Sequence, residues 1–268
     1  MKNKGDSFYI YGKKPVEEQL MRNPENVMRV FISDKMAKKD GGFQALREFA
    51  KEKRIPINPV TKAKIQDYVG DVNDQGVIAL LKRPEYEEFD DWFETLDLEA
   101  YPAILILDHI EDTHNFGALL RTAAAAGMAG VIVSKDRQAP INGVVYKTSA
   151  GALTQVPVVR VSNINQTIAK LKENKFWIAA VDIDPACRQA GKNAKNDTSL
   201  WSQTFDTPMG FILGAEGKGV HEKTLEHSDF VISIPMENDI ESLNVSVAGA
   251  VVMYEWKRQI TQLCKKTH

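Results

Sequence analysis

Residues 103–134, "AILILDHIEDTHNFGALLRTAAAAGMAGVIVS", contain the pattern that decides the fold. The segments "AILILD" (103–108) and "GVIVS" (130–134) are apolar runs of strand length. Between them, "HNFGALLRTAAAAG" (114–127) predicts a helix that ends at Gly127, because glycine is a good C-terminal cap. Continuously apolar strands joined by a helix indicate a parallel sheet that is covered on both faces.

The same alternation continues to the end of the chain. A loop and a short helix are expected at 140–153. The further strands that the pattern predicts are 156–162, 176–182, 209–214 and 229–236. The further predicted helices are 164–175, 220–228 and a long closing helix at 243–266. Residues 101–268 are therefore predicted to form one large α/β domain.

The N-terminal part of the chain predicts a smaller α/β domain over residues 1–82. Its predicted helices are 15–23 and 43–54, and its predicted strands are 27–33, 55–60 and 77–82. Residues 83–100 are acidic and aromatic, which predicts a linker between the domains. Within this segment, Trp92 and Phe93 are expected to pack onto one of the domains.

Composition places the chain among soluble globular proteins and argues against a membrane-spanning or secreted protein. It has 268 residues, 43% hydrophobic and 26% charged, and no apolar run approaches the roughly 20 residues of a membrane span. The polar N-terminus lacks a signal peptide's apolar region, and Cys187 and Cys264 lack metal-ligand spacing, so we expect reduced thiols and a cytoplasmic location.

Charge is unevenly distributed along the chain. Residues 1–84 hold 17 Lys and Arg against 11 Asp and Glu, whereas residues 85–99 hold 8 acidic residues and no basic one. A basic first third suggests a polyanionic partner such as RNA, and the alternative is an ordinary lysine-rich surface.

A glycine-rich loop follows the predicted strand 209–214. Gly214, Gly217 and Gly219 lie between a buried strand and a helix, where open α/β sheets bind ligands. Their spacing matches neither the dinucleotide pattern G-x-G-x-x-G nor the phosphate loop G-x-x-x-x-G-K-[ST], which disfavours a nucleotide cradle. A tight turn without a ligand is the alternative for this loop taken alone.

Two further polar features have a plain structural alternative. Ser242 or Asn244 is placed to cap the closing helix. Arg121 lies six residues after Asn115, so the two do not share a helix face unless Asn115 is in the first turn. Arg121 is expected either to pair with a surface carboxylate or to bind phosphate or RNA backbone.

A cluster of acidic residues and histidines after the first strand of the large domain suggests a metal site. It lacks helical His–His spacing, which favours a hydrophilic loop over a metal site. The cluster consists of Asp108, His109, Glu111, Asp112 and His114. No G-x-S-x-G sequence is present, which argues against Ser-His-Asp hydrolysis.

Three segments in this order resemble the three motifs of the SpoU/TrmH family of RNA ribose 2′-O-methyltransferases: "HNFGALLRTAAAAG", "FILGAEGKG" and "IPMENDIESLNVSVAGAVVMYE". The resemblance spans residues 103–260. The segments "YIYGKKPVEEQL" and "QGVIAL" resemble the family's L30e-like RNA-binding domain. This two-domain arrangement is similar to the branch that methylates a guanosine of 23S rRNA.

The resemblance implies an L30e-like RNA substrate-binding domain (1–82), an acidic linker (83–100) and a SPOUT methyltransferase domain (101–268) with a C-terminal trefoil knot. It also implies S-adenosylmethionine as cofactor, RNA as substrate and a homodimer that packs through the knot region. A tRNA 2′-O-methyltransferase and a non-catalytic ribosome-assembly factor with the same fold are the alternatives.

The resemblance also implies the site residues, carried over position by position. The catalytic set is Arg121, Asn115, Glu216, Ser242 and Asn244. The cofactor-binding set is Leu213, Gly214, Gly219, Ile234, Met236 and Leu243. No metal is implied. The sequence departs from the family's pattern at Asp74 in the small domain, where histidine is expected in many relatives. This departure affects the expected detailed contacts with RNA.

Physical chemistry modifies the role that the family assigns to the arginine. A guanidinium is too weak a base for ordinary proton abstraction. We therefore expect Arg121 to hold a phosphate of the target nucleotide and to stabilise the developing alkoxide. Ser242 and Asn244 are expected to orient Arg121, and Glu216 to position it or Asn115. The target nucleotide is expected in a single-stranded or looped region.

Overall fold

The computed structural model describes residues 7–37, 43–182, 197–217, 219–238 and 240–266. It divides into two compact units: Met1–Glu85 with Ile141–Lys147, and Tyr86–Pro140 with Thr148–His268. Cys187, one of the two cysteines considered above, lies outside the described residues. Within the described part of the chain, no helix has the length and apolarity that a membrane span requires.

The smaller unit is built around a four-stranded sheet. Its elements are β1 (Ser7–Tyr11), α1 (Lys13–Arg22), η1 (Pro24–Asn26), β2 (Val27–Ser33), α2 (Asp34–Ala37), α3 (Gln44–Glu52), β3 (Ile57–Val60), α4 (Lys62–Val69) and β4 (Val77–Lys82). The strand order is β1-β4-β2-β3, and β4 is antiparallel to both of its neighbours. One face packs on α1 and α3 through residues such as Leu20 and Leu46, and the other packs on α4 through Ile65.

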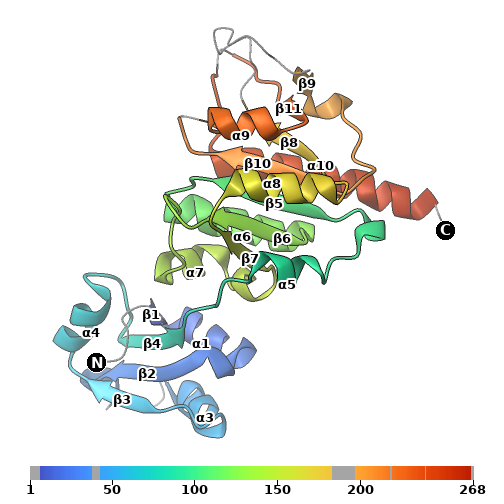
Figure 1. Ribbon diagram of the computed structural model, residues 1–268. Helices are drawn as coiled ribbons and strands as arrows, with labels where there is room; N and C mark the ends of the chain where they lie inside the picture. The colour runs from blue at the N-terminus through green and yellow to red at the C-terminus, as the bar shows by residue number, and fades with distance from the viewer. Residues whose placement is uncertain (1–6, 38–42, 183–196, 218, 239, 267–268) are drawn as a thin grey trace. The chain divides into compact units, whose positions relative to one another are not determined.

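The remaining elements form a strand–helix series. They are α5 (Phe89–Phe93), η2 (Leu98–Ala100), β5 (Ala103–Asp108), α6 (Thr113–Ala126), β6 (Gly130–Ser134), α7 (Gly143–Ser149), η3 (Ala152–Thr154), β7 (Val158–Val161), α8 (Ile164–Glu173), β8 (Trp177–Val181), β9 (Asp197–Ser199), η4 (Leu200–Ser202), β10 (Met209–Gly214), α9 (Glu222–His227), β11 (Phe230–Ser233) and α10 (Val245–Lys266). The strands form one seven-stranded sheet in the order β7-β6-β5-β10-β8-β11-β9 (Figure 1). Every paired strand is parallel, which confirms the predicted sheet.

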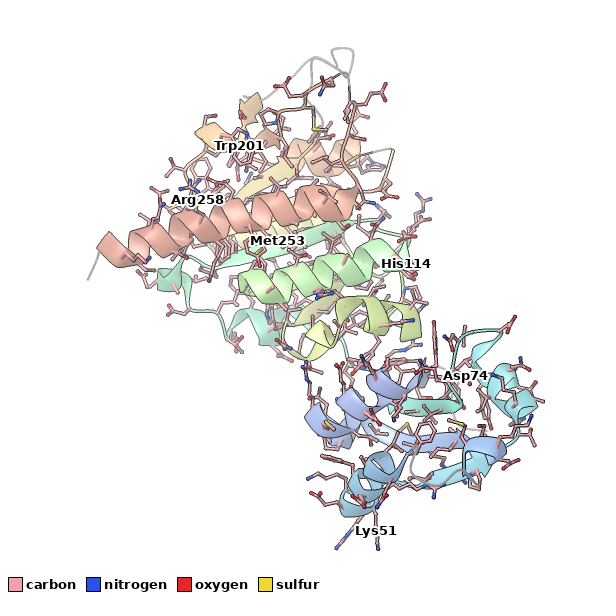
Figure 2. The ribbon with its side chains drawn as sticks, turned by 180° about the vertical axis from the view of Figure 1, so that it is seen from behind. Lys51, Asp74, His114, Trp201, Met253 and Arg258 are labelled. Carbon is pink, nitrogen blue, oxygen red and sulfur yellow. The ribbon has the colours of Figure 1, made fainter. Side chains whose placement is uncertain are left out.

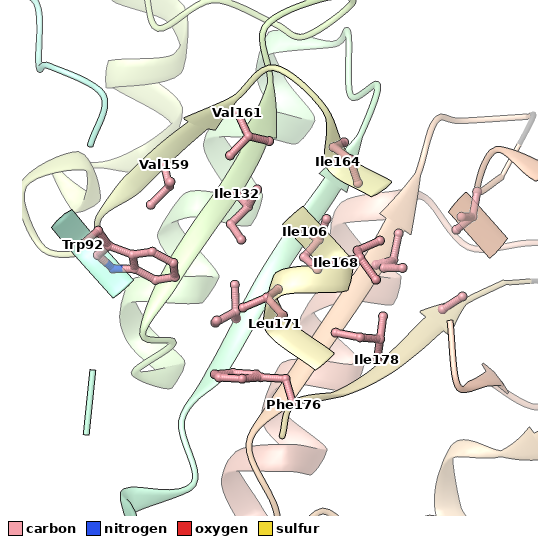
Figure 3. Packing of buried hydrophobic residues seen from close by; sticks show 14 of the residues in the cluster. Trp92, Ile106, Ile132, Val159, Val161, Ile164, Ile168, Leu171, Phe176 and Ile178 are labelled. Atoms are coloured by element: carbon pink, nitrogen blue, oxygen red, sulfur yellow. The ribbon is translucent and has the colours of Figure 1, made fainter. Parts of the chain in front are cut away.

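One face of the large sheet is covered by α8 together with α5 and α9. Ile106 of β5 and Ile178 of β8 pack there against Ile168 and Leu171 of α8 (Figure 3). Alternate residues of a strand point to opposite faces, so β5, which is apolar from Ala103 to Leu107, supplies side chains to both layers.

The other face carries α6 and α10, which lie side by side when the molecule is seen from behind (Figure 2). Gly249 of α10 makes this packing close, because a Cβ there would lie 2.6 Å from Leu119 Cδ2 and 2.7 Å from Leu213 Cδ1. The small alanine side chains of α6 allow this close approach to α10.

Most of the acidic segment, from Tyr86 onward, is grouped with the larger unit, and its role as a linker stays a prediction. Trp92 of α5 is 4% exposed, and its Nε1 donates to the Ala129 carbonyl oxygen over 3.3 Å. A Cβ on Gly130 would lie 2.4 Å from the Trp92 ring, so this position is fitted to glycine. The expected packing of Trp92 and Phe93 on a domain is confirmed, and burial of these aromatic side chains is the reason that α5 joins the large core.

Candidate active site

A pocket of about 820 Å³ opens at the carboxyl ends of β8, β10 and β11 and at the start of α10. Its walls are the segments 213–217 with 219, 233–238 and 240–245, to which Val181, Asp182, Ser199 and Ala248 are added. The volume falls within the range of small-molecule and cofactor sites, and the carboxyl edge of a parallel sheet is where such sites occur.

The loop after β10 is folded back on itself at Gly214. Ala215 and Gly219 form an isolated bridge, in which the Gly219 N–H donates to the Ala215 carbonyl oxygen over 2.8 Å. A Cβ on Gly214 would lie 2.0 Å from the Gly219 carbonyl carbon and 2.1 Å from the Val220 nitrogen. Because those atoms belong to the backbone, no side chain fits at Gly214, and the spacing of the glycines reflects this turn.

Three side chains from three elements meet beside the pocket. Asn115 Nδ2 and Asn244 Nδ2 each donate to Glu216 Oε1 over 2.6 Å. Asn244 Nδ2 also donates to Asn115 Oδ1 over 3.0 Å. This network joins the start of α6, the loop after β10 and the residue before α10, although the three residues are far apart in sequence.

Both asparagines are held by helix termini. Asp112 caps α6 by accepting the Asn115 backbone N–H over 2.8 Å, which leaves the Asn115 side chain in the first turn and 9% exposed. Asn244 Oδ1 accepts the Ser246 N–H over 2.9 Å, so Asn244 caps α10 while its amide group binds Glu216. Asn244 therefore has both roles: it caps α10 and it takes part in the network with Glu216.

The structure gathers most of the predicted site residues around one cavity. Nine of the eleven line the pocket: Leu213, Gly214, Glu216, Gly219, Ile234, Met236, Ser242, Leu243 and Asn244. Asn115 is connected to them through its hydrogen bonds with Glu216 and Asn244.

Arg121 is placed differently from the other predicted catalytic residues. It is exposed on α6, almost two turns beyond Asn115, and it is not among the residues that line the pocket. A separation of six residues puts the two side chains on different sides of the helix. The chain by itself therefore does not bring Arg121 into the pocket wall.

Three of the five residues considered for a metal site, Asp108, His109 and Asp112, have structural partners. Asp108 Oδ1 lies 2.6 Å from His109 Nδ1, and Asp108 Oδ2 accepts the His221 N–H over 3.0 Å. Asp112 is the cap of α6. Among the described residues, no group of three or more His, Cys, Asp or Glu is arranged to hold a metal ion.

Several pocket residues were not anticipated from the sequence. Glu237 and Glu241 line the pocket within a segment that was already singled out, and their acidity was a readable signal. Ser199 lines it from the end of β9, a strand that the hydrophobic pattern did not indicate. Asp182 lies at the end of the predicted strand 176–182, where parallel sheets place ligand residues.

The chemistry of the walls suits a cationic ligand with an apolar part. The described lining residues include four carboxylates, those of Asp182, Glu216, Glu237 and Glu241, and among them there is no lysine or arginine. Apolar side chains such as Ile234 and Leu243 line the same cavity. S-adenosylmethionine carries a sulfonium and an ammonium charge beside an adenine ring, so the residues present fit it.

Comparisons with known proteins agree along the whole chain. The SpoU rRNA Methylase family matches residues 102–254, and the family of RNA 2′-O ribose methyltransferase substrate binding domains matches residues 9–87. A Staphylococcus epidermidis protein assigned to the TrmH family of tRNA/rRNA methyltransferases is 35% identical over 263 residues, covering 98% of this chain and 100% of the relative.

Solved structures show the same fold. The SpoU methyltransferase AviRb from Streptomyces viridochromogenes, in complex with the cofactor AdoMet, superposes with a TM-score of 0.72 at 19% identity, over 97% of this chain and 95% of that one. An AdoMet-bound rRNA methyltransferase from Sinorhizobium meliloti gives a TM-score of 0.71 at 18% identity, over 94% and 87% of the two chains. The predicted fold class, an α/β SPOUT domain that follows a small α/β domain in the sequence, is confirmed. The family match over more than half of the chain, with 35% identity to a relative along nearly all of it, shows that this chain belongs to the SpoU/TrmH family of RNA methyltransferases.

Proposed function

We propose that this chain transfers a methyl group from S-adenosylmethionine to a ribose 2′-hydroxyl of RNA, with a guanosine of 23S rRNA as the target. The observation that carries the proposal is the Asn115–Glu216–Asn244 network beside a pocket of about 820 Å³ with acidic and apolar walls. The substrate-binding family match at residues 9–87 supports RNA as the acceptor.

The pocket residues divide the work of binding the cofactor. Leu213, Gly214 and Gly219 line the pocket, and their backbone groups would help to hold the cofactor. Ile234 and Leu243 would provide apolar contact for the adenine, while Glu237 and Glu241 would attract the sulfonium and ammonium charges of the cofactor. When bound, S-adenosylmethionine supplies a methyl group that is already activated on sulfur.

The protein's remaining task is to align the ribose oxygen and to help it lose its proton. Glu216 Oε1 holds both asparagine amides, so Glu216 acts as the positioning group of the network. Ser242 and Asn244, at the start of α10, orient the groups that meet the ribose. Alignment of this kind is worth several orders of magnitude in rate when the nucleophile is held in line.

Arg121 is assigned to the phosphate of the target nucleotide. Its guanidinium is always charged and suits phosphate geometry, and it favours negative charge that develops on the ribose oxygen. Since Arg121 is exposed and outside the pocket lining, we propose a homodimer in which α6 of one protomer brings this arginine to the site of its partner.

The substrate class within the family is the finer part of the proposal. Two-domain organisation and the basic residues of 1–84 favour 23S rRNA, with a looped guanosine, in the cytoplasm. A tRNA substrate is the competing possibility, and the name of the Staphylococcus epidermidis relative covers both RNA classes. A non-catalytic assembly factor is disfavoured, because an inactive site has no need of the complete asparagine–glutamate network.

The test uses labelled S-adenosylmethionine with unmethylated total rRNA and, separately, tRNA, followed by mapping of the label. Label on a ribose of 23S rRNA supports the proposal. Label on tRNA shows instead that tRNA is the substrate. Tight RNA binding without methyl transfer supports a non-catalytic assembly factor. The variant Arg121→Lys is expected to lose most activity, about 10²-fold or more, and to keep its affinity for S-adenosylmethionine in calorimetry. Loss of cofactor binding instead contradicts the phosphate role of Arg121.

A further inference from the structure

His109 has a backbone conformation that a histidine rarely adopts. Its φ is 64°, in the left-handed region where glycine is unstrained and other residues are not. It lies directly after β5, at the edge of the sheet where the pocket opens. Strained non-glycine residues persist only where the surrounding contacts determine them, and they concentrate at functional sites.

The contact that determines His109 is a buried carboxylate. Asp108 is 2% exposed, and its Oδ1 lies 2.6 Å from His109 Nδ1. Asp108 Oδ2 accepts the His221 N–H over 3.0 Å, so the carboxylate cannot turn away.

Asp108 and His109 both contact the second of the two loops that carry the network: Asp108 Oδ2 accepts the His221 N–H over 3.0 Å, and the ring centroids of His109 and His221 lie 6.3 Å apart. His109 begins the loop to α6, on which Asn115 lies, and His221 ends the loop from β10, on which Glu216 lies. Asp108 is also the register partner of Gly214, where the second loop begins. Asn115 Nδ2 then donates to Glu216 Oε1 across the gap between the same loops.

We propose that His109 is a positioning residue for methyl transfer: through Asp108 it holds the loop 109–112 so that Asn115 meets Glu216. This inference rests on the proposed function, because it concerns the alignment of the same site. Replacement of His109 by glycine relieves the backbone strain and removes the side chain that binds Asp108.

The variant His109→Gly separates positioning from stability. A merely structural residue loses activity in step with its melting temperature. For His109→Gly we expect a melting temperature close to that of the wild type, because relief of the left-handed backbone offsets the lost contact with Asp108, while kcat falls about 10-fold to 100-fold. The affinity for S-adenosylmethionine, measured by calorimetry, is expected to stay unchanged, because His109 does not line the pocket.

Two further variants serve as controls. Lys175→Gly relieves a left-handed residue of nearly the same φ, 65°, at the amino end of β8, and it is expected to leave kcat unchanged. His109→Asn keeps a side chain that tolerates this φ and places an amide donor near Asp108, so it is expected to restore most of the activity.

Hydrogen exchange supplies a readout that does not depend on activity. In His109→Gly, the backbone amides of residues 109–115 are expected to exchange faster than in the wild type, whereas those of the large core are not. Unchanged kcat and unchanged exchange in this variant overturn the proposal. A wild-type protein that transfers no methyl group to any RNA defeats the proposed function, while the exchange measurement still decides whether His109 holds the loop.

Discussion

The two edges of the large sheet are closed in different ways. At the amino edge, strands are joined through the backbone: Trp177 N donates to the Pro208 carbonyl oxygen over 2.9 Å, and Met209 N to that of Pro102 over 3.0 Å. At the carboxyl edge, backbone bonds such as that from Asp182 N to the Ile232 carbonyl oxygen are joined by bonds between side chains, those of Asn115 and Asn244 to Glu216.

This difference shows where the molecule depends on residue identity. Backbone hydrogen bonds are available to nearly every sequence, so loops at the amino edge tolerate change. Bonds between side chains exist only for particular residues, so the carboxyl edge combines structural and functional constraint. Mutations at the two edges are expected to separate activity from stability.

The largest effect is expected for Gly214→Ala at the carboxyl edge. The added Cβ would lie about 2 Å from backbone atoms of Gly219 and Val220, which cannot move without opening the loop. We expect a loss of about 3 kcal/mol or more in the free energy of unfolding and a loss of cofactor binding. Urea unfolding and calorimetry measure both.

Gly217→Ala is the matched control for that change. Gly217 has a φ of 73° but nothing within 4 Å of an added Cβ, so only the backbone strain of about 1 kcal/mol is expected. Equal costs for the two variants contradict the steric explanation at Gly214.

The next effect is expected for Asn244→Ala. This change removes two donors from the network and the cap of α10, so we expect activity to fall by about 10²-fold and the free energy of unfolding by about 1 kcal/mol. Methyl-transfer kinetics and urea unfolding provide the two values. Ser246→Ala, which leaves the amide group of Asn244 in place, should retain most activity. If Ser246→Ala loses as much activity as Asn244→Ala, the effect comes from the start of the helix and not from the network.

The smallest effect on activity is expected at the amino edge, for Asp229→Ala. Asp229 Oδ2 accepts the Ile178 N–H over 2.8 Å, and its Oδ1 lies 2.6 Å from Lys172 Nζ. Because this is one of the few side-chain bonds at that edge, we expect a cost of about 1 kcal/mol in the free energy of unfolding and an unchanged kcat. If kcat falls by more than the loss of stability explains, the distinction between the two edges is contradicted.

Much of the fold was predictable because its strands are buried on both faces. The apolar runs at 103–108 and 209–214 coincide with β5 and β10 to the residue. The short β9 and the helix α4 were not predicted, since three residues or a weakly apolar stretch give little periodic signal. The packing of the acidic segment was predictable from its aromatic residues, and Trp92 is buried as expected.

For the candidate site, the residues came from motif resemblance, and their grouping came from the fold. Leu243 and Gly214 belong to separate motifs, yet both line one pocket. Arg121 was predicted together with them, but it lies outside that lining because the helix turns it away from Asn115. Asp108 and His109 were noticed as possible metal ligands, and only their contacts in the folded chain indicated a positioning role.

The sequence by itself determined the parallel α/β class, the glycine loop after 209–214 and the family, because these follow from local periodicity and from motif order. Tertiary structure decided which polar groups meet: Asn115 and Asn244 are 129 residues apart and are brought within 3.0 Å by α6 and α10 packing on the same sheet face. The physical reason is that a hydrogen bond depends on position in space, and the positions are fixed only when the strands are paired and the helices are packed.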